Sequence, residues 1–398
     1  MVKSSIGDKA KAQALRCLIN IMKQPEVMEQ TVGVGGLDAF IKHLKSPTNR
    51  IIKLVSIVIS VLCSQRKYAD MISQKGAIAA LVNVLQKNSD PDVLTDVVTA
   101  LGAVCDGSDS RQSLLNTTSN GIQCLTSILE ECVDPDLLLA LCQCVSKVTR
   151  RHTLNQNTFV SCGGTSSIIT LTDVKNKEIQ LAAVDTIHML AEGNHLTQKV
   201  LTDEGVTGPL INLLNKSKSQ VIQEKTAGAL WALAGDDGEE RRKMAATMGV
   251  NLLIDFLSSL SEILHFIGCE GLGVLAQGAH NQQDAIAEAN GVHPLVRLLK
   301  CDKEYLVLSA IRSIRHLCVG VGYLPHPQNQ NTVARARGVK VLIALLMLSN
   351  NELIQVESAL SLASIALGRY NTIYFSPVIF LLTSIVLVRV IGYCKERR

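Results

Sequence analysis

Apolar residues recur along the chain in short helical runs, each placed just after a glycine of nearly constant spacing. The run Ala77–Leu85 follows Gly76, and comparable runs begin at Val206 and Val292. Successive glycines of this kind lie 40 to 47 residues apart: Gly36, Gly76, Gly121, Gly164, Gly205, Gly249, Gly291 and Gly338. A period in the low forties with several helices per unit is typical of an α-solenoid, whose units bury their apolar faces by stacking. The pattern therefore predicts an all-α solenoid.

Each unit is expected to contain three helices, as the unit around Gly76 illustrates. A short helix, Tyr68–Gln74, ends near Gly76, where glycine supplies a left-handed C-cap. A second helix covers Ala77–Gln86. The third and longest helix covers Asp92–Asp106, with Asp90 as its cap and Pro91 at its first position.

The two ends of the chain depart from this pattern. Residues 6–22 fit only a third helix, and a loop over 319–331 lengthens the last interval. We therefore predict three segments: an incomplete N-terminal repeat over 1–23, eight repeats over 24–368, and an apolar tail over 369–398.

The three-helix layout resembles the armadillo repeat, with its short helix, Gly-Ala-Ile-like junction, Leu-Val-x-Leu-Leu helix and longer third helix. The resemblance covers roughly Ala10 to Gly368 in eight phased copies. It implies a right-handed superhelix of armadillo repeats whose third helices line a concave groove. It also implies that a protein partner lies along this groove as an extended peptide or a helix.

Within that family, the import adaptor importin-α carries a groove Trp followed four residues later by an Asn in successive repeats. The positions equivalent to the Trp are Ser60, Gly102, Ser146, His188, Trp231, Gly273, Arg315 and Ala363. The positions equivalent to the Asn are Ser64, Asp106, Arg150, Glu192, Gly235, Gln277, Val319 and Leu367. Because no asparagine occupies this second set, the resemblance disfavours an import-adaptor-like carrier of basic peptides.

The predicted groove residues combine flat, cationic, acidic and amide side chains. They are Arg150, His188, Glu192, Trp231, Gln277, Arg312 and Arg315. Tryptophan and arginine are enriched among interface anchors, which supports their inclusion. Core packing is the alternative role for Trp231, and a solvated face is the alternative for Arg315.

Composition restricts the choice of partner and compartment. Apolar residues make up 47% of the 398 residues and aromatic residues 3%, so the core must be built from aliphatic side chains. The 39 basic and 35 acidic residues are too balanced to favour nucleic acid. No Cys-x-x-Cys occurs among the twelve cysteines, and Cys63, Cys105 and Cys318 occupy repeat positions that elsewhere hold alanine. These thiols are therefore expected to be reduced and structural, as in a cytosolic or nuclear protein.

No catalytic, metal-binding or cofactor motif emerges from the sequence. The glycines of the segment 268–273 lie inside a third helix with no preceding strand, so close helix packing explains them better than phosphate binding. The nine histidines lack the spacing of metal ligands. We therefore expect no enzyme activity, no cofactor and no bound metal.

The tail contains a long apolar stretch. Residues 373–393 would form a helix about 31 Å long, which matches a bilayer core. Its marker residues are Ile373, Phe380, Leu387 and Tyr393. The stretch predicts a single-pass C-terminal membrane anchor with the solenoid in the cytoplasm. The alternative is a segment that covers the open end of a cytoplasmic solenoid.

These features together predict a non-catalytic, monomeric scaffold for protein–protein interaction, tethered to a membrane through its C-terminus. A truncated product of a larger repeat protein is a further interpretation, because the pattern begins inside a repeat.

Overall fold

The computed structural model describes residues 7–368, except the side chains at positions 118 and 119. It folds them into 25 α-helices and one short 3-10 helix, η1 (Val321–Tyr323). No strand occurs among the described residues, and one isolated antiparallel bridge joins Val319 to Pro325. The prediction of an all-α solenoid is confirmed.

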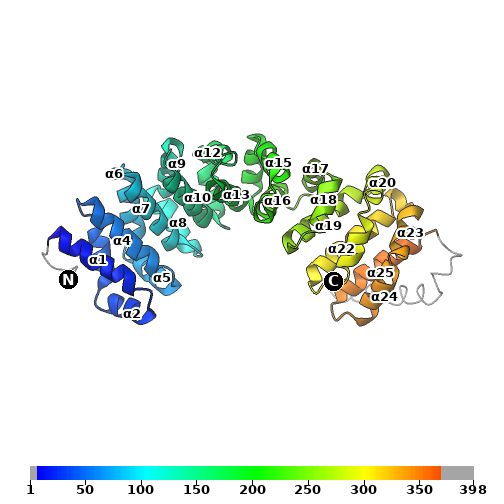
Figure 1. Ribbon diagram of the computed structural model, residues 1–398, viewed down its shortest axis with the longest axis horizontal. Coiled ribbons are helices and arrows are strands. Elements are labelled where there is room, and N and C mark those ends of the chain that lie inside the picture. The colour runs from blue at the N-terminus through cyan, green and yellow to red at the C-terminus, as the bar shows by residue number, and fades with distance from the viewer. Residues whose placement is uncertain (1–6, 369–398) are drawn as a thin grey trace. The chain divides into compact units, whose positions relative to one another are not determined.

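The chain divides into two compact units, residues 1–235 and residues 236–398 (Figure 1). Unit 1 contains one leading helix, α1, and five three-helix repeats. Their bounds are α1 (Asp8–Ile21); α2 (Pro25–Gly33), α3 (Gly36–His43), α4 (Asn49–Leu62); α5 (Arg66–Gln74), α6 (Ala77–Lys87), α7 (Pro91–Cys105); α8 (Asp109–Ser119), α9 (Gly121–Glu131), α10 (Pro135–Thr149); α11 (Thr153–Ser161), α12 (Gly164–Leu171), α13 (Lys177–Ala191); and α14 (His195–Asp203), α15 (Thr207–Lys216), α16 (Gln220–Ala234).

The described part of unit 2 contains three further repeats of the same kind. Their bounds are α17 (Gly238–Met248), α18 (Val250–Phe256), α19 (Glu262–Ala276); α20 (His280–Glu288), α21 (Val292–Leu298), α22 (Glu304–Cys318); and α23 (Pro327–Arg335), α24 (Gly338–Leu348), α25 (Glu352–Ala366).

Within each unit, the third helices of successive repeats pack against one another. In unit 1 each of α4, α7, α10, α13 and α16 packs against the next in this order, and in unit 2 α22 packs against both α19 and α25. Small residues permit this close approach. Cys105 and Cys318 are fully buried, as are Ala191 and Ala276 at the equivalent positions. Cys63 is only half-buried.

The recurring glycine fulfils two different structural requirements. Gly76 adopts the left-handed conformation with φ +86°, as expected for a C-cap. At Gly164 the left-handed residue is instead the preceding Gly163 (φ +85°), and Gly164 begins α12. A Cβ atom at Gly164 would lie 2.5 Å from Cζ of Phe159, so that position requires glycine for space rather than for backbone freedom.

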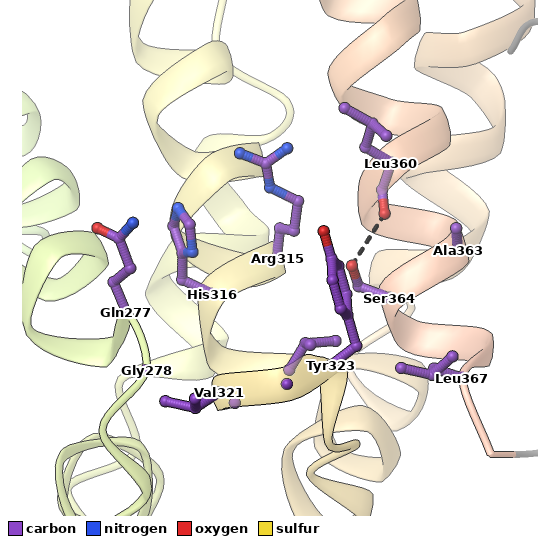
Figure 2. A pocket seen from close by; sticks show the side chains of 13 residues that line it. Gln277, Gly278, Arg315, His316, Val321, Tyr323, Leu360, Ala363, Ser364 and Leu367 are labelled. Atoms are coloured by element: carbon purple, nitrogen blue, oxygen red, sulfur yellow. Dashed lines mark hydrogen bonds between the residues drawn. The ribbon is translucent and has the colours of Figure 1, made fainter.

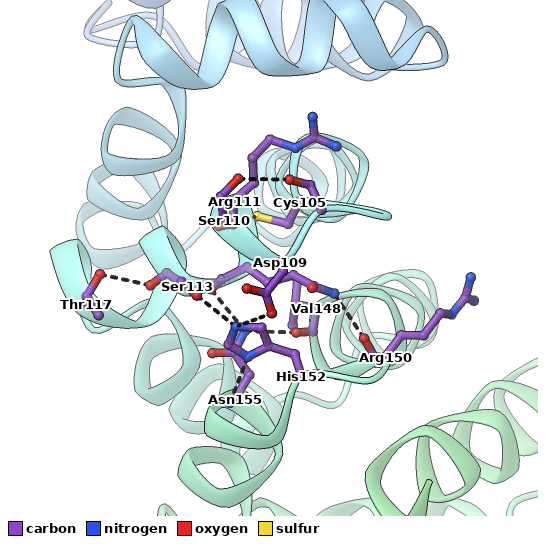
Figure 3. Close-up of polar contacts among 12 residues, drawn as sticks. Cys105, Asp109, Ser110, Arg111, Ser113, Thr117, Val148, Arg150, His152 and Asn155 are labelled. Carbon is purple, nitrogen blue, oxygen red and sulfur yellow. Dashed lines mark hydrogen bonds and ion pairs between the residues drawn. The ribbon is translucent and has the colours of Figure 1, made fainter. Parts of the chain in front are cut away.

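Side-chain caps begin several of the helices. The Asp90 carboxylate accepts a hydrogen bond from the backbone N–H of Asp92, with Pro91 at the first helical position, as predicted. His152 caps α11 differently: its Nδ1 accepts from the N–H of Asn155, and its Nε2 lies 2.9 Å from Oγ of Ser113 (Figure 3).

In six of the eight described repeats, a side chain of the first helix donates to the end of the third helix of the same repeat. Gln156 of α11 is 1% exposed and donates to the carbonyl oxygens of Met189 (2.8 Å) and Glu192 (3.3 Å). The equivalent residues are Gln112, Gln198, Gln283 and Gln330, and in α17 the Arg242 side chain makes the corresponding contacts with Val274 and Gln277. A helix leaves its last four carbonyl oxygens without partners, and this amide ladder satisfies some of them.

The prediction of a single-pass membrane anchor, and of the membrane localisation drawn from it, is wrong. No helix within residues 7–368 is long and apolar enough to cross a bilayer. The longest of these helices, such as α22, have 15 residues, whereas a span needs about 20. The four residues that marked the expected anchor lie outside the described residues: Ile373, Phe380, Leu387 and Tyr393.

Candidate functional site

The candidate site is the solvent-facing side of the third helices, which we call the third-helix surface. Unit 1 presents it on α4, α7, α10, α13 and α16, and unit 2 presents it on α19, α22 and α25. Because these helices pack side by side within each unit, their exposed residues adjoin from one repeat to the next. Each unit carries a cavity at the C-terminal ends of three of these helices.

The cavity of unit 1 has a volume of about 470 Å³ and lies at the ends of α4, α7 and α10. Its walls combine three cations, one carboxylate and two serine hydroxyls: Arg66, Arg111, Lys147, Asp106, Ser60 and Ser64. Arg66 is exposed and Lys147 is half-buried. The cavity therefore has a basic lining.

Arg111 of α8 is the most buried of these cations, with 3% of its surface exposed. One terminal nitrogen of its guanidinium forms an ion pair with Asp70, and the other donates to the carbonyl oxygen of Asp106 at 2.7 Å. Its own carbonyl oxygen accepts a contact from the Cys105 thiol, which fixes the start of α8 against the end of α7 (Figure 3). The arginine is thus held rigidly within the cavity wall.

A polar row continues over α10, α13 and α16. Asp185 accepts hydrogen bonds from Ser146 Oγ at 2.9 Å and from Lys225 Nζ at 2.5 Å. Burial acts to raise the pKa of Asp185, but the Lys225 ammonium together with the Ser146 hydrogen bond outweighs it and holds that pKa below its usual range. The His188 imidazole lies over Gly228 of the next repeat, and burial lowers its pKa. His188 is therefore neutral near pH 7.

The predicted residues of unit 1 differ in accessibility. Arg150 is exposed at the end of α10, and Glu192, at the end of α13, pairs with Arg151 at 3.1 Å. Trp231 of α16 is only 8% exposed and belongs to the buried core of unit 1. Its small accessible area gives a partner little to contact.

The cavity of unit 2 has a volume of about 570 Å³ and lies at the ends of α19, α22 and α25. Figure 2 shows the ring of Tyr323, from η1, standing between Arg315 and the C-terminal part of α25. Tyr323 is 82% exposed. Apolar lining comes from Leu360 and Ala363 of α25 and from Leu367 directly after it, so this cavity joins an aromatic ring to aliphatic walls.

Arg312 and Arg315 converge on one carboxylate. Glu357 of α25 is 8% exposed, and its oxygens lie 2.9 Å from Nε of Arg312 and 3.1 Å from a terminal nitrogen of Arg315. Burial, with the charges of both arginines, lowers the pKa of neighbouring His316 to about 4 despite the opposing charge of Glu357. The arginines are therefore partly neutralised inside unit 2.

The structure brings together only some of the predicted residues. Gln277 and Arg315 line the same cavity in unit 2, and Arg312 is joined to Arg315 through Glu357. His188 lies in the last turn of α13, and Glu192 is the C-cap residue directly after that helix. The sequence reasoning missed Arg111, Tyr323 and Glu357. The predicted loop over 319–331 contains Tyr323 and was the sequence feature that could have pointed to it. No neighbouring residue in the sequence marks Arg111, because its ionic partner lies 41 residues away.

The fold and its third-helix surface define a repeat protein of stacked three-helix units. The chain resembles armadillo-repeat proteins in sequence and in fold. The family model of the armadillo/beta-catenin-like repeat matches residues 280–319, which span the repeat formed by α20, α21 and α22.

Three curated relatives share part of this sequence. The chain is 37% identical over 131 residues to the ankyrin and armadillo repeat-containing protein of Mus musculus and 42% identical over 81 residues to that of Homo sapiens. These matches cover 32% and 20% of the chain but only 9% and 6% of the relatives, so the chain matches less than a tenth of their length. Vacuolar protein 8 of Schizosaccharomyces pombe is 26% identical over 257 residues, or 63% of the chain and 45% of the relative.

The residues of individual repeats also predict a likeness to the armadillo part of the ankyrin and armadillo repeat-containing protein. The matches to the mouse and human forms of that protein confirm the likeness. Among solved structures, an engineered protein superimposes with a TM-score of 0.79 at 23% identity, covering 92% of this chain and 87% of the other. A designed armadillo repeat protein gives a TM-score of 0.52 at 21% identity, covering 61% and 99%. Both show the fold.

Proposed function

We propose that this chain is a non-catalytic scaffold that binds a peptide or a helical segment of a protein partner along its third-helix surface. The observation that carries the proposal is the position of the two cavities. Each lies at the C-terminal ends of three consecutive third helices, one in each unit, where residues from adjacent repeats converge. Interface anchors tend to fill pockets of this kind.

Charged groups on this surface are arranged to contact a partner rather than to perform chemistry. Arg150 and Gln277 are exposed, whereas His188, Glu192, Arg312 and Arg315 are half-buried and fix the shape of the surface. Trp231 contributes through core packing. Burial raises the pKa of the Cys142 and Cys144 thiols to about 12, which keeps them protonated and unsuited to nucleophilic roles.

One comparison and the charge balance of the chain support a segment of a protein as the partner. Computationally designed armadillo repeat proteins for modular peptide recognition share this fold, and their solved structure superimposes with a TM-score of 0.52 at 20% identity over 61% of this chain. The near balance of basic and acidic residues supports a protein partner over nucleic acid. We propose a monomer as the binding form, because the third-helix surface of one chain offers both cavities.

A random-peptide display selection with the whole chain as bait tests the proposal. Ala363 is exposed at the mouth of the unit 2 cavity, so Ala363→Arg should block that cavity and abolish binding of peptides selected for it. Ala344 is exposed on α24, away from this cavity, and Ala344→Arg is the matched control that should leave binding unchanged. Selection that yields no binding peptide, or peptides equally affected by both variants, would overturn the proposal.

A further inference from the structure

We propose that the basic cavity of unit 1, at the ends of α4, α7 and α10, is a binding site for the phosphorylated side chain of a protein partner. The inference rests on the proposed function and assigns the ligand chemistry of one part of the same surface. It is carried by three cations that converge on one cavity, each from a different helix: Arg66 from α5, Arg111 from α8 and Lys147 from α10.

The charges of Arg66 and Lys147 are available to a ligand. Within residues 7–368, no carboxylate lies within ion-pair distance of either side chain. Arg66 is exposed and Lys147 is half-buried, so both can adjust to an anion that enters from solvent. Cations placed on a cavity wall without a partner raise the local positive potential and attract anions.

Arg111 supplies a fixed charge behind these two. It is 97% buried, because its exposed fraction is 3%, and its two terminal nitrogens are occupied by Asp70 and by the carbonyl oxygen of Asp106. Its Nε is buried and has no hydrogen-bond partner among the described residues. An arginine buried with an unsatisfied donor is costly unless another interaction compensates for it, and a bound anion would do so.

The rest of the lining favours a phosphate over a carboxylate. Asp106 is the one carboxylate that lines the cavity. Asp70 lies outside the lining and offsets part of the Arg111 charge. The three cations therefore leave a net positive charge after these two acids are counted. The hydroxyls of Ser60 and Ser64 add donors. A phosphoserine or phosphothreonine carries about −1.5 to −2 charges and three acceptor oxygens, which suits this spread of donors better than one carboxylate does. The volume of about 470 Å³ leaves room for such a group and for flanking residues.

Fluorescence anisotropy with the whole chain tests the proposal. The probes are three labelled peptide pools with the same degenerate flanks and a central phosphoserine, serine or glutamate. We expect the phosphoserine pool to bind at least about tenfold more tightly than either other pool. The double variant Arg66→Ala with Lys147→Ala should abolish this preference. Lys67→Ala, which removes the adjacent exposed cation outside the cavity, should retain it.

Each contrary outcome has a distinct meaning. Equal binding of the phosphoserine and glutamate pools would overturn the choice of phosphate, and equal loss in Lys67→Ala and in the double variant would show bulk charge attraction instead. Phosphate-independent binding of all pools would overturn this inference while leaving the proposed function intact. Recovery of peptides in the display selection separates that case from failure of the scaffold itself. Matching melting temperatures of the variants would exclude unfolding as the cause of any loss.

Discussion

The side-chain amide of Gln156 lies 2.8 Å from the backbone carbonyl oxygen of Met189, a residue of α13, the third helix of the same repeat. This contact joins α11 to α13 through a polar group that is almost fully buried. It stabilises the end of α13, whose last carbonyl oxygens would otherwise lack partners.

Gln156→Ala should therefore lower the free energy of unfolding by about 2 kcal/mol, because it leaves buried carbonyl oxygens without a donor. Chemical denaturation followed by circular dichroism would measure the change. Gln143→Ala is the matched control, since Gln143 is exposed on α10 and its loss should cost less than about 0.5 kcal/mol. Equal effects of the two substitutions would show that the amide contact contributes nothing.

The two glycine roles predict different responses to the same substitution. Gly164→Ala should destabilise the protein by about 1 to 3 kcal/mol because its Cβ would collide with the Phe159 ring. Combining it with Phe159→Leu, which shortens that side chain, should cost less than the sum of the two single changes.

Gly76→Ala should cost about 1 to 2 kcal/mol through backbone strain alone, because nothing lies within 4 Å of a Cβ there. Shortening a neighbouring side chain should not relieve this backbone strain. Thermal unfolding of the single and double variants would separate the two cases. Additive behaviour at Gly164 would contradict the steric explanation.

The sequence was sufficient for the fold because its strongest signals are local and repeated. The glycine period and the apolar runs identified each repeat, and the Asp90 cap was found where a helix start required one. The amide ladder also has a sequence signal, since Gln112, Gln156 and Gln198 recur at the repeat spacing. That signal was missed because apolar periodicity does not consider buried polar residues.

The candidate site was harder to predict because it depends on contacts between repeats. Alignment placed Gln277 and Arg315 at groove positions, and they do line one cavity. The same alignment placed Trp231 there, but its burial depends on how neighbouring helices surround it. Glu357 could not be connected to Arg312, 45 residues earlier, without knowing how α22 packs against α25.

His316 predicts a pH dependence of stability. Its pKa in the folded protein is about 4, below its ordinary value of 6.5, because burial and the two nearby arginines disfavour the charged form. The unfolded chain therefore binds more protons between these values, and the stability that His316 contributes above pH 6.5 is lost as the pH falls towards 4.

The loss should be at most about 3 kcal/mol. His316→Gln should flatten this part of the stability profile, measured by denaturation at a series of pH values. His195→Gln, which changes an exposed histidine of unit 1, is the control and should leave the profile unchanged. A profile that is identical in the His316 variant and the original chain would remove His316 as its source.

The Glu357 carboxylate predicts a test of charge balance in unit 2. Glu357→Gln should destabilise the chain by about 2 kcal/mol, because it leaves Arg312 and half-buried Arg315 without their shared anion. Adding Arg312→Met should recover part of this loss, since it removes one of the two unbalanced cations while retaining an aliphatic side chain. The free energies of unfolding of the original chain, the two single variants and the double variant together give the coupling free energy. A coupling close to zero would mean that the two groups are solvated independently, and the explanation of the depressed pKa of His316 by this cluster would then rest on burial alone.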